Sequence, residues 1–529
     1  MLTTLGVKNL RSFTNECHFK LAPITVFVGR NSSGKSSLLR TFPLMRQSFE
    51  ANTTGPILWY GRLVDFGDFE EAISKNNQSN NIEFSFGLKP SEVSSDPFAW
   101  EINNILEGLD VVVKLIISSV DKKTITKEIN ITVDHTKLTI TMEKDYSQAL
   151  FSFQNKKYKY HKNVTLGGMN IKFLPTLVYV KNSDETGSHA DDDIYWNGIT
   201  RTTRRSIFSR RKFEREIVNL ASEALKPYFH RNTNLESLSK VLWQLSSISR
   251  SEIINFLQSS FSDKKFFINQ ISDSSVLEDV VSKMQVFMFL KSYNLIADAI
   301  NENLRASFES IKYLAPIRAS TERYYRFQDL QVNEMDHTGS NLAMILNSFS
   351  AKENDDFQSW IRSNFGFNVT IEQSVGHYAI MIQNENDSTK HNISDMGFGY
   401  SQVLPIILSI WLETQKDSHE NNEAIFVIEQ PELHLHPAYQ TKLAILFAKI
   451  IELSKQTKSN IKIIFETHSQ QMIDAFGDCI ENAELNFNKN DVSILIFDKE
   501  DGTGTSVHKA NFDDQGYFEN WPVGFFSGK

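Results

Sequence analysis

The stretch Gly29-Arg-Asn-Ser-Ser-Gly-Lys35-Ser36 constrains the fold of this chain more than any other, because it matches G-x-x-x-x-G-K-[ST] completely. An alternating apolar run from Ile24 to Val28 predicts a strand before it, and Ser36 to Phe42 can begin a helix. A glycine-rich turn between a strand and a helix directs backbone N–H groups at phosphate oxygens. The sequence therefore predicts a nucleotide-phosphate site, and the flanking elements argue against a chance glycine turn.

Several positions of this loop have an expected role. Lys35 would place its charge near the β- and γ-phosphates, and the Ser36 hydroxyl would ligate Mg²⁺. Arg11, shortly before the loop, would either contact the nucleotide or remain a solvated surface charge. Pro43 predicts that the helix kinks or stops there. The remaining expected nucleotide contacts are Gly29, Asn31, Ser32, Ser33, Gly34 and Ser37.

Length and composition restrict the class of protein. With 529 residues, the chain can form two or more domains with cores of their own. A net charge of −9 gives no overall attraction to nucleic acid, so such a contact would need a local basic patch. The two cysteines make no disulfide framework, the N-terminus lacks a secretory signal, and the apolar stretch 403–412 is too short for a bilayer. We expect a cytoplasmic protein that does not enter a membrane.

The chain reads as four consecutive parts around an α/β core. Residues 1–90 form an N-terminal lobe that carries the phosphate loop, and residues 91–181 contain period-two apolar runs typical of an antiparallel β subdomain. Residues 182–310 show helical patterning and form a helical insertion, and alternating strands and helices resume over 311–529. The predicted fold class is α/β with an antiparallel β subdomain and a helical insertion.

A dense basic segment lies inside the predicted helical insertion. Residues Arg201 to Arg215 include seven basic side chains against one acid, Glu214, with Phe208 and Phe213 between them. Arginine forks suit phosphates and can stack on bases, but a charge run is also compatible with a solvated helix face. Contact with nucleic acid or with an acidic partner stays an open alternative here.

Two apolar strands in the last third of the chain end in polar residues. The run Ala424–Glu429 predicts a buried strand whose terminal carboxylate would hold Mg²⁺, directly or through water, in a Walker B arrangement. Pro437 suits the first position of the next helix. The second run, 461–465, is followed by His468, which would either sense the γ-phosphate or satisfy local hydrogen bonds.

A second glycine-containing helix start lies before these strands. Gly397 and Gly399 precede an apolar helix, with Ser401 and Gln402 close behind, and together they favour another phosphate-binding N-terminus. One chain cannot easily use two such elements on a single nucleotide. We therefore expect the second element to cap the nucleotide of a partner subunit.

The order of these segments resembles a known family. NLRSF, GRNSSGKSS, DMGFGYSQ, VIEQPELHLHP and FETHS resemble the ABC-class ATPases that power SMC, Rad50 and RecF proteins. The ELHLHP box is similar to the OLD-like branch, and within it to the PtuA ATPases of Septu and retron-linked anti-phage systems. The resemblance covers about residues 1–70 and 311–529 and implies an ABC-type P-loop ATPase head, with the family's Q-loop near Asp65–Phe69.

The resemblance also implies cofactors and partners. Lys35, Ser36 and Glu429 of one head would bind ATP and Mg²⁺, and the 397–402 segment of another would close over them in an ATP-sandwich dimer or higher homo-oligomer. The family partner is an HNH nuclease resembling PtuB. In a retron setting, a reverse transcriptase and its RNA–DNA hybrid would be further partners.

One position departs from the family pattern. The residue after the Walker B acid is usually a glutamate that polarises water, but here it is Gln430, which cannot accept the proton. Glu432 is the nearest substitute. We expect slow hydrolysis, with Lys35, Glu429, Gln430, Glu432 and His468 as the candidate catalytic set.

Three functions are compatible with these features. The first is a regulatory ATPase of an anti-phage defence complex whose nuclease is a separate polypeptide, since we find no nuclease cluster in this sequence. The second is a DNA repair or recombination ATPase resembling RecF or Rad50. The third is a binding module in which ATP only sets the oligomer. An HNH nuclease encoded next door would favour the first.

Overall fold

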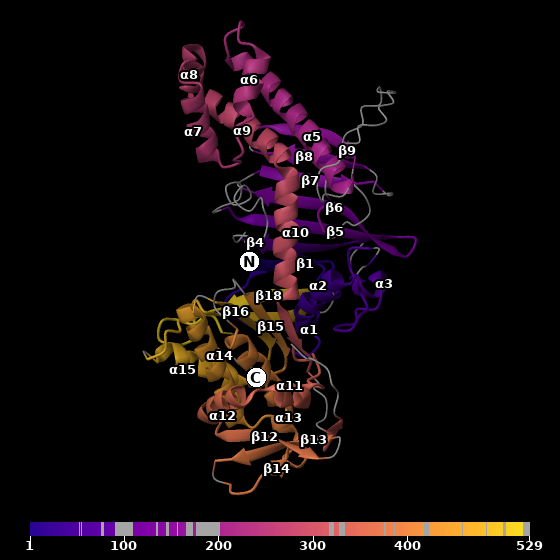
Figure 1. Cartoon of the computed structure of the whole chain (residues 1–529), viewed down its shortest axis with the longest axis vertical. Coiled ribbons are helices and arrows are strands. Elements are labelled where there is room, and N and C mark those ends of the chain that lie inside the picture. Colours follow the sequence, from indigo (N-terminus) through magenta and orange to yellow (C-terminus); the bar gives the residue numbers. More distant parts are fainter. Residues whose placement is uncertain are drawn as a thin grey trace. The chain divides into compact units, whose positions relative to one another are not determined.

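The computed structural model of the chain is drawn in Figure 1. It describes residues 1–51, 53, 55–75, 79–89, 109–133, 136–143, 148–155, 157–165, 173–175, 201–316, 322–326, 334–374, 377–385, 387–416, 423–457, 459–482, 484–500 and 504–521; residues 165, 201–212, 398 and 500 are described by their backbone alone. The chain forms two compact units. Unit 1 comprises Met1–Gly6, Thr53–Pro56 and Asn80–Arg305, and unit 2 comprises Val7–Asn52, Ile57–Ser79 and Ala306–Lys529.

Unit 1 contains the antiparallel sheet that the sequence predicts. Its strands follow one another in the order β4-β5-β6-β7-β8-β9, each antiparallel to the next, with β1 beside β4. Residues 150–160, inside the predicted β subdomain, belong to two strands, and the Asn155 N–H donates to the Tyr158 carbonyl between them. The strands are β1 (Leu2–Lys8), β4 (Asn81–Leu88), β5 (Val111–Val120), β6 (Lys123–Val133), β7 (Thr136–Met142), β8 (Gln148–Gln154) and β9 (Lys159–Thr165).

Two helices of unit 1 pack against strand β8 of this sheet. Phe151 and Phe153 of β8 pack edge-on against Tyr293 and Phe289, with ring centroids 4.9 and 5.9 Å apart. Of residues 166–181, the last part of the predicted β subdomain, the structure describes only 173–175, and these form no strand. The helices are α5 (Arg201–Leu225), η1 (Lys226–Tyr228), α6 (Leu235–Leu242), α7 (Arg250–Ser260), α8 (Lys265–Ile271), α9 (Ser274–Lys291) and α10 (Tyr293–Glu309).

Unit 2 is built on a mostly parallel sheet with the order β10-β15-β16-β3-β17-β18. Only the last pair, β17 and β18, is antiparallel. Parallel strands end at the same edge, so the segments after β3, β15 and β16 meet there. The strands are β10 (Ile311–Leu314), β15 (Glu423–Glu429), β16 (Asn460–Glu466), β3 (Ile24–Gly29), β17 (Val492–Glu500) and β18 (Gly504–Ala510). β2 (Cys17–Lys20) precedes β3.

A smaller antiparallel sheet belongs to the same unit. β12 pairs with β13, which also pairs with β11 and β14. Helix α12 begins with a capping box, in which the Ser350 side chain and Glu353 bond each other's backbone N–H. The elements are β11 (Tyr325–Arg326), α11 (Leu342–Ser348), α12 (Ala351–Phe365), β12 (Phe367–Ser374), β13 (His377–Asn384), β14 (His391–Asn392) and η2 (Ile393–Asp395).

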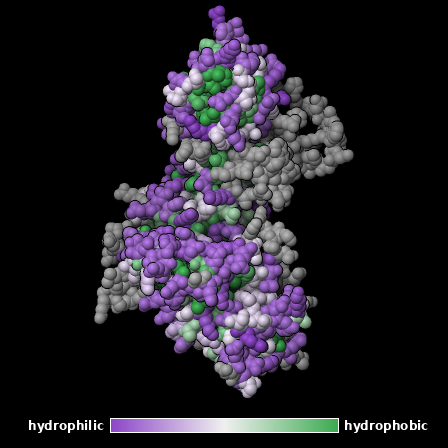
Figure 2. Space-filling view, turned by 90° about the vertical axis from the view of Figure 1, so that its left-hand side faces the viewer, coloured by the Kyte–Doolittle hydropathy of each residue, from purple (hydrophilic) through white to green (hydrophobic). Residues whose placement is uncertain are grey.

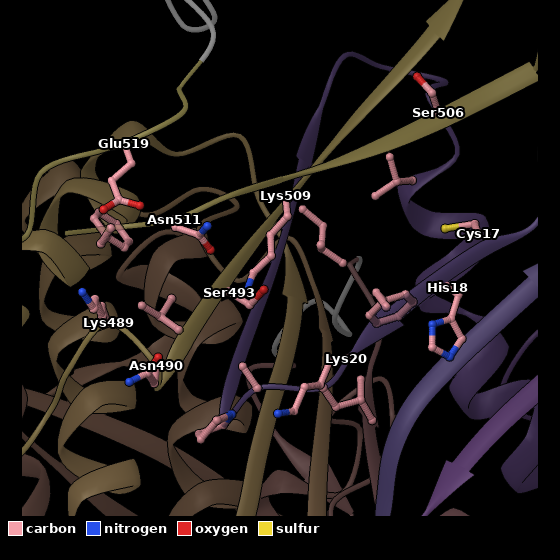
Figure 3. Close-up of a pocket in the computed structure, with 18 of the residues that line it drawn as sticks. Cys17, His18, Lys20, Lys489, Asn490, Ser493, Ser506, Lys509, Asn511 and Glu519 are labelled. Atoms are coloured by element: carbon pink, nitrogen blue, oxygen red, sulfur yellow. The ribbon is translucent and has the colours of Figure 1, made fainter. Parts of the chain in front are cut away.

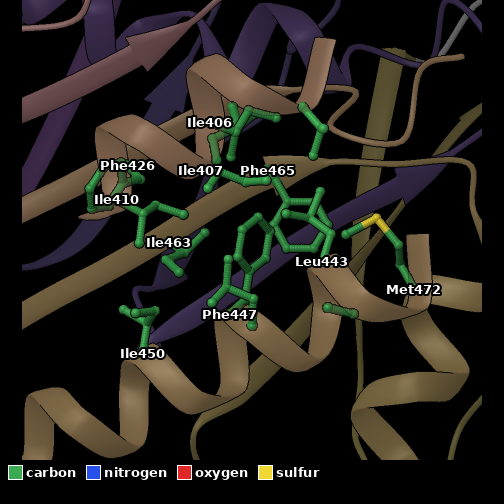
Figure 4. Packing of buried hydrophobic residues seen from close by; sticks show 14 of the residues in the cluster. Ile406, Ile407, Ile410, Phe426, Leu443, Phe447, Ile450, Ile463, Phe465 and Met472 are labelled. Atoms are coloured by element: carbon green, nitrogen blue, oxygen red, sulfur yellow. The ribbon is translucent and has the colours of Figure 1, made fainter. Parts of the chain in front are cut away.

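The helices of unit 2 bury the faces of the large sheet. Figure 4 shows apolar side chains of α13 and α14 pointing at residues of β15 and β16, such as Phe426 and Phe465. This packing explains why both strands read as continuous apolar runs, since a parallel strand is covered on both faces. The helices are α1 (Lys35–Leu39), α2 (Thr41–Glu50), α3 (Phe69–Ala72), α13 (Phe398–Thr414), α14 (Pro437–Thr457) and α15 (Gln470–Glu481).

Pro43 and Pro437 act as predicted on helix boundaries. The first helix ends at Leu39, and a new helix begins at Thr41 with Pro43 in its first turn. Pro43 has no N–H to bond the Leu39 carbonyl, so the helix breaks one turn earlier than the proline itself. Pro437 occupies the first position of α14.

The face drawn in Figure 2 is mainly hydrophilic, with hydrophobic residues gathered near the top of the view. Large apolar side chains exposed on the helices and joints of unit 1 include Leu235, Trp243 and Phe266. Among the residues that the structure describes, no helix is both long and apolar enough to span a bilayer.

Candidate nucleotide site

The loop between β3 and α1 has the backbone of a phosphate-binding turn. Ser32 and Gly34 both have positive φ, of 61° and 97°, and Gly34 caps α1 without any side-chain hydrogen bond. A Cβ at Gly34 would lie 2.6 Å from Ser12 Oγ, so only glycine fits. Thr505 of β18 stabilises the loop, because its hydroxyl donates a hydrogen bond to the Ser33 carbonyl at 2.9 Å. The first N–H groups of α1 have no intrahelical partner and are available to a phosphate.

The side chains of the loop fit an anionic ligand. The Lys35 ammonium donates to the carbonyls of Gly29 and Arg30, at 2.9 and 2.8 Å, and so folds back over the loop. Burial lowers the pKa of Lys35, and Glu466 and Glu432 oppose that effect. The Ser33 hydroxyl is buried and has no hydrogen-bond partner among the described residues. Asn31 and Ser32 are exposed, Gly29 is buried, and Ser36 and Ser37 are half-buried. A buried cation and unused donors are what a triphosphate requires.

The carboxylate that meets Ser36 is Glu466, at the end of β16. The Ser36 hydroxyl donates to this carboxylate and lies 2.9 and 2.8 Å from its two oxygens. Glu466 is only 2% exposed. Burial, with the neighbouring charge of Glu429, raises its pKa to about 7. The sequence reasoning did not select Glu466, although it ends an apolar strand just as Glu429 does.

Glu429, the predicted magnesium ligand, is held by two other side chains. Arg40 donates to both of its oxygens, with Nε–Oε1 and Nη2–Oε2 distances of 2.7 and 2.8 Å, and the Tyr313 hydroxyl donates to Oε1 at 2.6 Å. The hydrogen bond to Glu429 raises the pKa of Arg40, and burial and Glu429 together raise that of Tyr313. Neither Arg40 nor Tyr313 was selected from the sequence, because nothing local marks them as partners of a residue hundreds of positions away.

The structure brings Gln430, Glu432 and His468 together at the same edge of the sheet. The Gln430 N–H donates to the Glu466 carbonyl at 3.1 Å, and Gln430 has a positive φ of 42°. The His468 N–H donates to Glu432 Oε1 at 2.7 Å. Burial lowers the pKa of His468, and the charge of Lys35 lowers it further. A neutral imidazole beside a lysine can accept or donate a hydrogen bond near a phosphate. The catalytic roles of these residues stay predictions.

The predicted partner-capping segment begins α13. Gly397 caps the helix with φ 76°, and open space surrounds the position of its missing Cβ. Gly399 lies close to the His434 carbonyl, 3.3 Å from where a Cβ would be. Ser401 and Gln402, however, are only 2% and 4% exposed in this structure. The accessible part of the segment is therefore its beginning, where Gly397 is exposed and Gly399 is half-buried.

The side chain of Arg11 contacts the Asp65–Phe69 loop, where the resemblance places the Q-loop. Its guanidinium is 4.3 Å from the centre of the Phe66 ring and donates to the Asp65 carbonyl at 3.3 Å. Burial lowers the pKa of Arg11, and the charge of Arg40 adds to this effect. The contacts with Asp65 and Phe66 hold the Arg11 guanidinium in place. A contact between Arg11 and a nucleotide stays a prediction.

The basic segment Arg201 to Arg215 begins helix α5. The side chains of residues 201–212 lie outside the described residues, so the predicted nucleic-acid contact stays a prediction. Phe213 is buried, which gives this aromatic residue a structural place rather than a base-stacking one.

A cavity of about 960 Å³ lies between the 15–23 segment and the strands β17 and β18. Figure 3 shows Lys20, Lys509 and Ser493 among the side chains that line it. Thr505 also lines it and links it to the loop through the Ser33 carbonyl. None of the predicted nucleotide contacts is among its lining residues.

Comparisons with known proteins place this chain in a family. No curated protein matches the chain. Two solved SMC head domains are similar over 96% of this chain. The first, bound to the C-winged helix domain of ScpA, has a TM-score of 0.35 and 10% sequence identity, and 97% of its length is covered. The second, from Thermotoga maritima, has a TM-score of 0.32 and 9% sequence identity, and 98% of its length is covered. TM-scores below 0.5 are too low to establish a shared fold. The AAA_15 family model, described as an AAA ATPase domain, matches residues 1–473. The chain therefore belongs to the AAA_15 family of AAA ATPase domains.

Proposed function

We propose that this chain is the ATP-binding and ATP-hydrolysing subunit of an anti-phage defence complex, in which copies of the chain pair around MgATP and control a partner HNH-type nuclease. The family match supports a P-loop ATPase. The finer part of the proposal rests on the resemblance of the five sequence segments to the PtuA ATPases.

One observation carries the ATPase part of the proposal. The glycine-rich loop after β3 and the acid-tipped ends of β15 and β16 converge at one edge of a parallel sheet, where Ser36 bonds Glu466 and where Glu429 is the residue paired with Glu466 across the two strands. Ligands of open α/β sheets bind at this edge. A hydroxyl, two carboxylates and a lysine are the groups that a magnesium-bound triphosphate requires.

Each residue of the site has a defined task in this proposal. Lys35 would leave the Gly29 and Arg30 carbonyls and bind the phosphates, and Ser36 would ligate Mg²⁺, which neutralises charge on the phosphates when bound. Gln430 would orient the attacking water without accepting its proton. We expect turnover below about 1 s⁻¹, the lower end of typical enzyme rates.

The partner-capping role belongs to the first turn of α13. Gly397 lacks a side chain and has open space around it, so a nucleotide held by another copy can approach the backbone closely. The burial of Ser401 and Gln402 leaves the backbone of this turn as the part that would reach the phosphate. Pairing of two heads through this turn would enclose two nucleotides.

The nuclease partner is tested by co-purification. The chain is expressed with a tagged HNH protein encoded beside it, as wild type and as Lys35→Ala. We expect wild type to form the complex and to control the activity of the partner nuclease. In Lys35→Ala, which lacks the phosphate-binding cation, we expect the activity of the nuclease to be no longer controlled by the chain. A neighbourhood of recombination genes and a chain that binds no HNH protein would contradict the defence role.

A further inference from the structure

Two buried glutamates lie side by side in the proposed site, and they are held very differently. Glu429 and Glu466 are paired across the neighbouring parallel strands β15 and β16, and they are 1% and 2% exposed. They have the same chemistry, the same depth and the same position at the end of a strand. Their different hydrogen-bond partners therefore decide which one is available to a metal ion.

Glu429 is already neutralised by the protein. Arg40 supplies two charge-assisted hydrogen bonds in a fork that matches both carboxylate oxygens, and Tyr313 supplies a third. To take up Mg²⁺ directly, Glu429 would have to give up part of this pairing, and breaking a buried ion pair is costly. Glu429 is best suited to hold Arg40 and the end of β15 in place.

Glu466 is held by much weaker partners. Among the described residues, the hydroxyl of Ser36 is the hydrogen-bond donor that its two oxygens share, and one hydroxyl proton serves both. The charges of Lys35 and Arg40 also act on it, without a hydrogen bond from either to its carboxylate in the structure. A buried carboxylate with a single neutral hydrogen-bond donor has unused lone pairs, and a divalent cation would use them.

The spacing of Ser36 and Glu466 also suits magnesium. Adjacent oxygen ligands of an octahedral Mg²⁺ ion, at metal–oxygen distances of about 2.0–2.1 Å, lie about 2.9 Å apart. The Ser36 hydroxyl oxygen lies 2.9 and 2.8 Å from the two Glu466 oxygens. This is the ordinary length of a hydrogen bond between two oxygens, and it means that Mg²⁺ could replace the shared proton without moving either side chain far.

We propose that Glu466 of β16, together with Ser36, is the carboxylate that binds the magnesium ion of the nucleotide, and that Glu429 acts as a positioning residue bound to Arg40 and Tyr313. This assignment rests on the proposed ATP site and changes the metal ligand predicted from the sequence.

The test compares the two glutamates by the same substitution. Binding of a fluorescent ATP analogue, N-methylanthraniloyl-ATP, is measured with EDTA and with saturating Mg²⁺ for wild type, Glu466→Gln and Glu429→Gln. The affinity with Mg²⁺ divided by the affinity with EDTA measures how much the metal ion contributes to binding. Residues that position metal ligands change metal affinity by about 10- to 100-fold when they are replaced, and loss of a direct ligand should exceed this. Glu466→Gln should therefore lower the ratio by at least about 100-fold, and Glu429→Gln should lower it by at least about tenfold less than Glu466→Gln does. Thermal unfolding of each variant shows whether it is folded.

The outcomes separate the metal assignment from the ATP site itself. A ratio that stays within threefold of wild type in Glu466→Gln, or that falls equally in Glu429→Gln, would overturn the assignment. If Glu466→Gln does not fold, the aspartate variants replace it, and Glu466→Asp should lose more of the ratio than Glu429→Asp. Failure of the proposed function looks different, because the wild type would then bind no analogue, or Lys35→Ala would bind it as tightly.

Discussion

The ion pair between Arg40 and Glu429 makes a quantitative prediction about stability. Arg40→Ala removes two of the hydrogen bonds to a carboxylate that is 1% exposed and leaves it beside a second buried carboxylate, Glu466. Removing one partner of a buried pair costs about 3–5 kcal/mol. Tyr313 still donates to Glu429, and the Arg40 side chain is 33% exposed, so we expect the lower end, about 3 kcal/mol.

The assay is thermal unfolding of the full chain in EDTA without nucleotide. For a unit of this size, about 2 °C per kcal/mol is expected, so Arg40→Ala should unfold about 6 °C below wild type. Glu429→Gln in the Arg40→Ala background removes the uncompensated charge and should recover part of the loss. Coupled neighbours show interaction energies of about 0.5–3 kcal/mol in such a cycle. Losses that simply add, or a shift below 1 °C, would refute the reasoning.

Three further predictions concern the same site. Gln430→Glu supplies the missing proton acceptor and should raise ATP turnover by about 100-fold, measured as phosphate release, whereas unchanged turnover would mean that Gln430 does not contact the water. Burial and Glu429 raise the pKa of Glu466 from 4.5 to about 7. The contribution of this one group to stability is therefore full below the unfolded pKa and is lost as the pH rises towards 7. In EDTA, this loss of stability amounts to about 3 kcal/mol. Glu466→Gln should remove this difference between the free energies of unfolding measured at pH 5 and pH 8. An unchanged pH dependence in the variant would mean that another group causes it. Gly34→Ala places a Cβ 2.6 Å from Ser12 Oγ at a backbone φ of 97°, and should lower the free energy of unfolding by about 1–3 kcal/mol. It should also abolish nucleotide binding measured by titration calorimetry. Wild-type affinity in this variant would show that the loop geometry is not required.

The sequence predicts the parts of this fold whose signals are local. Residues 24–36 carry the whole strand, turn and start of a helix, so β3 and α1 form where expected. The period-two apolar runs between residues 110 and 143 form the strands β5, β6 and β7, because their alternation is a local signal. The break before Pro43 also follows from one missing N–H and one carbonyl.

The contacts inside the site depend on sheet order, which no local pattern encodes. Ser36 meets Glu466 because β16 lies between β3 and β15, and Arg40 meets Glu429 across 389 positions of sequence. The burial of Ser401 follows from the start of α13 at Phe398, which turns this residue towards the core. A sequence gives the chemical types at each strand end, but the order of strands decides which pairs form.

The most direct test of the whole account is the mass of the full chain in solution with and without nucleotide. Light scattering after size exclusion is measured without nucleotide, with Mg²⁺ and the slowly hydrolysed analogue ATPγS, and for Lys35→Ala under both conditions. We predict that wild type shifts from the 60.6 kDa of one chain to at least twice that mass with nucleotide, and that Lys35→Ala does not. A wild-type mass that does not respond to the nucleotide would contradict a dimer closed by MgATP.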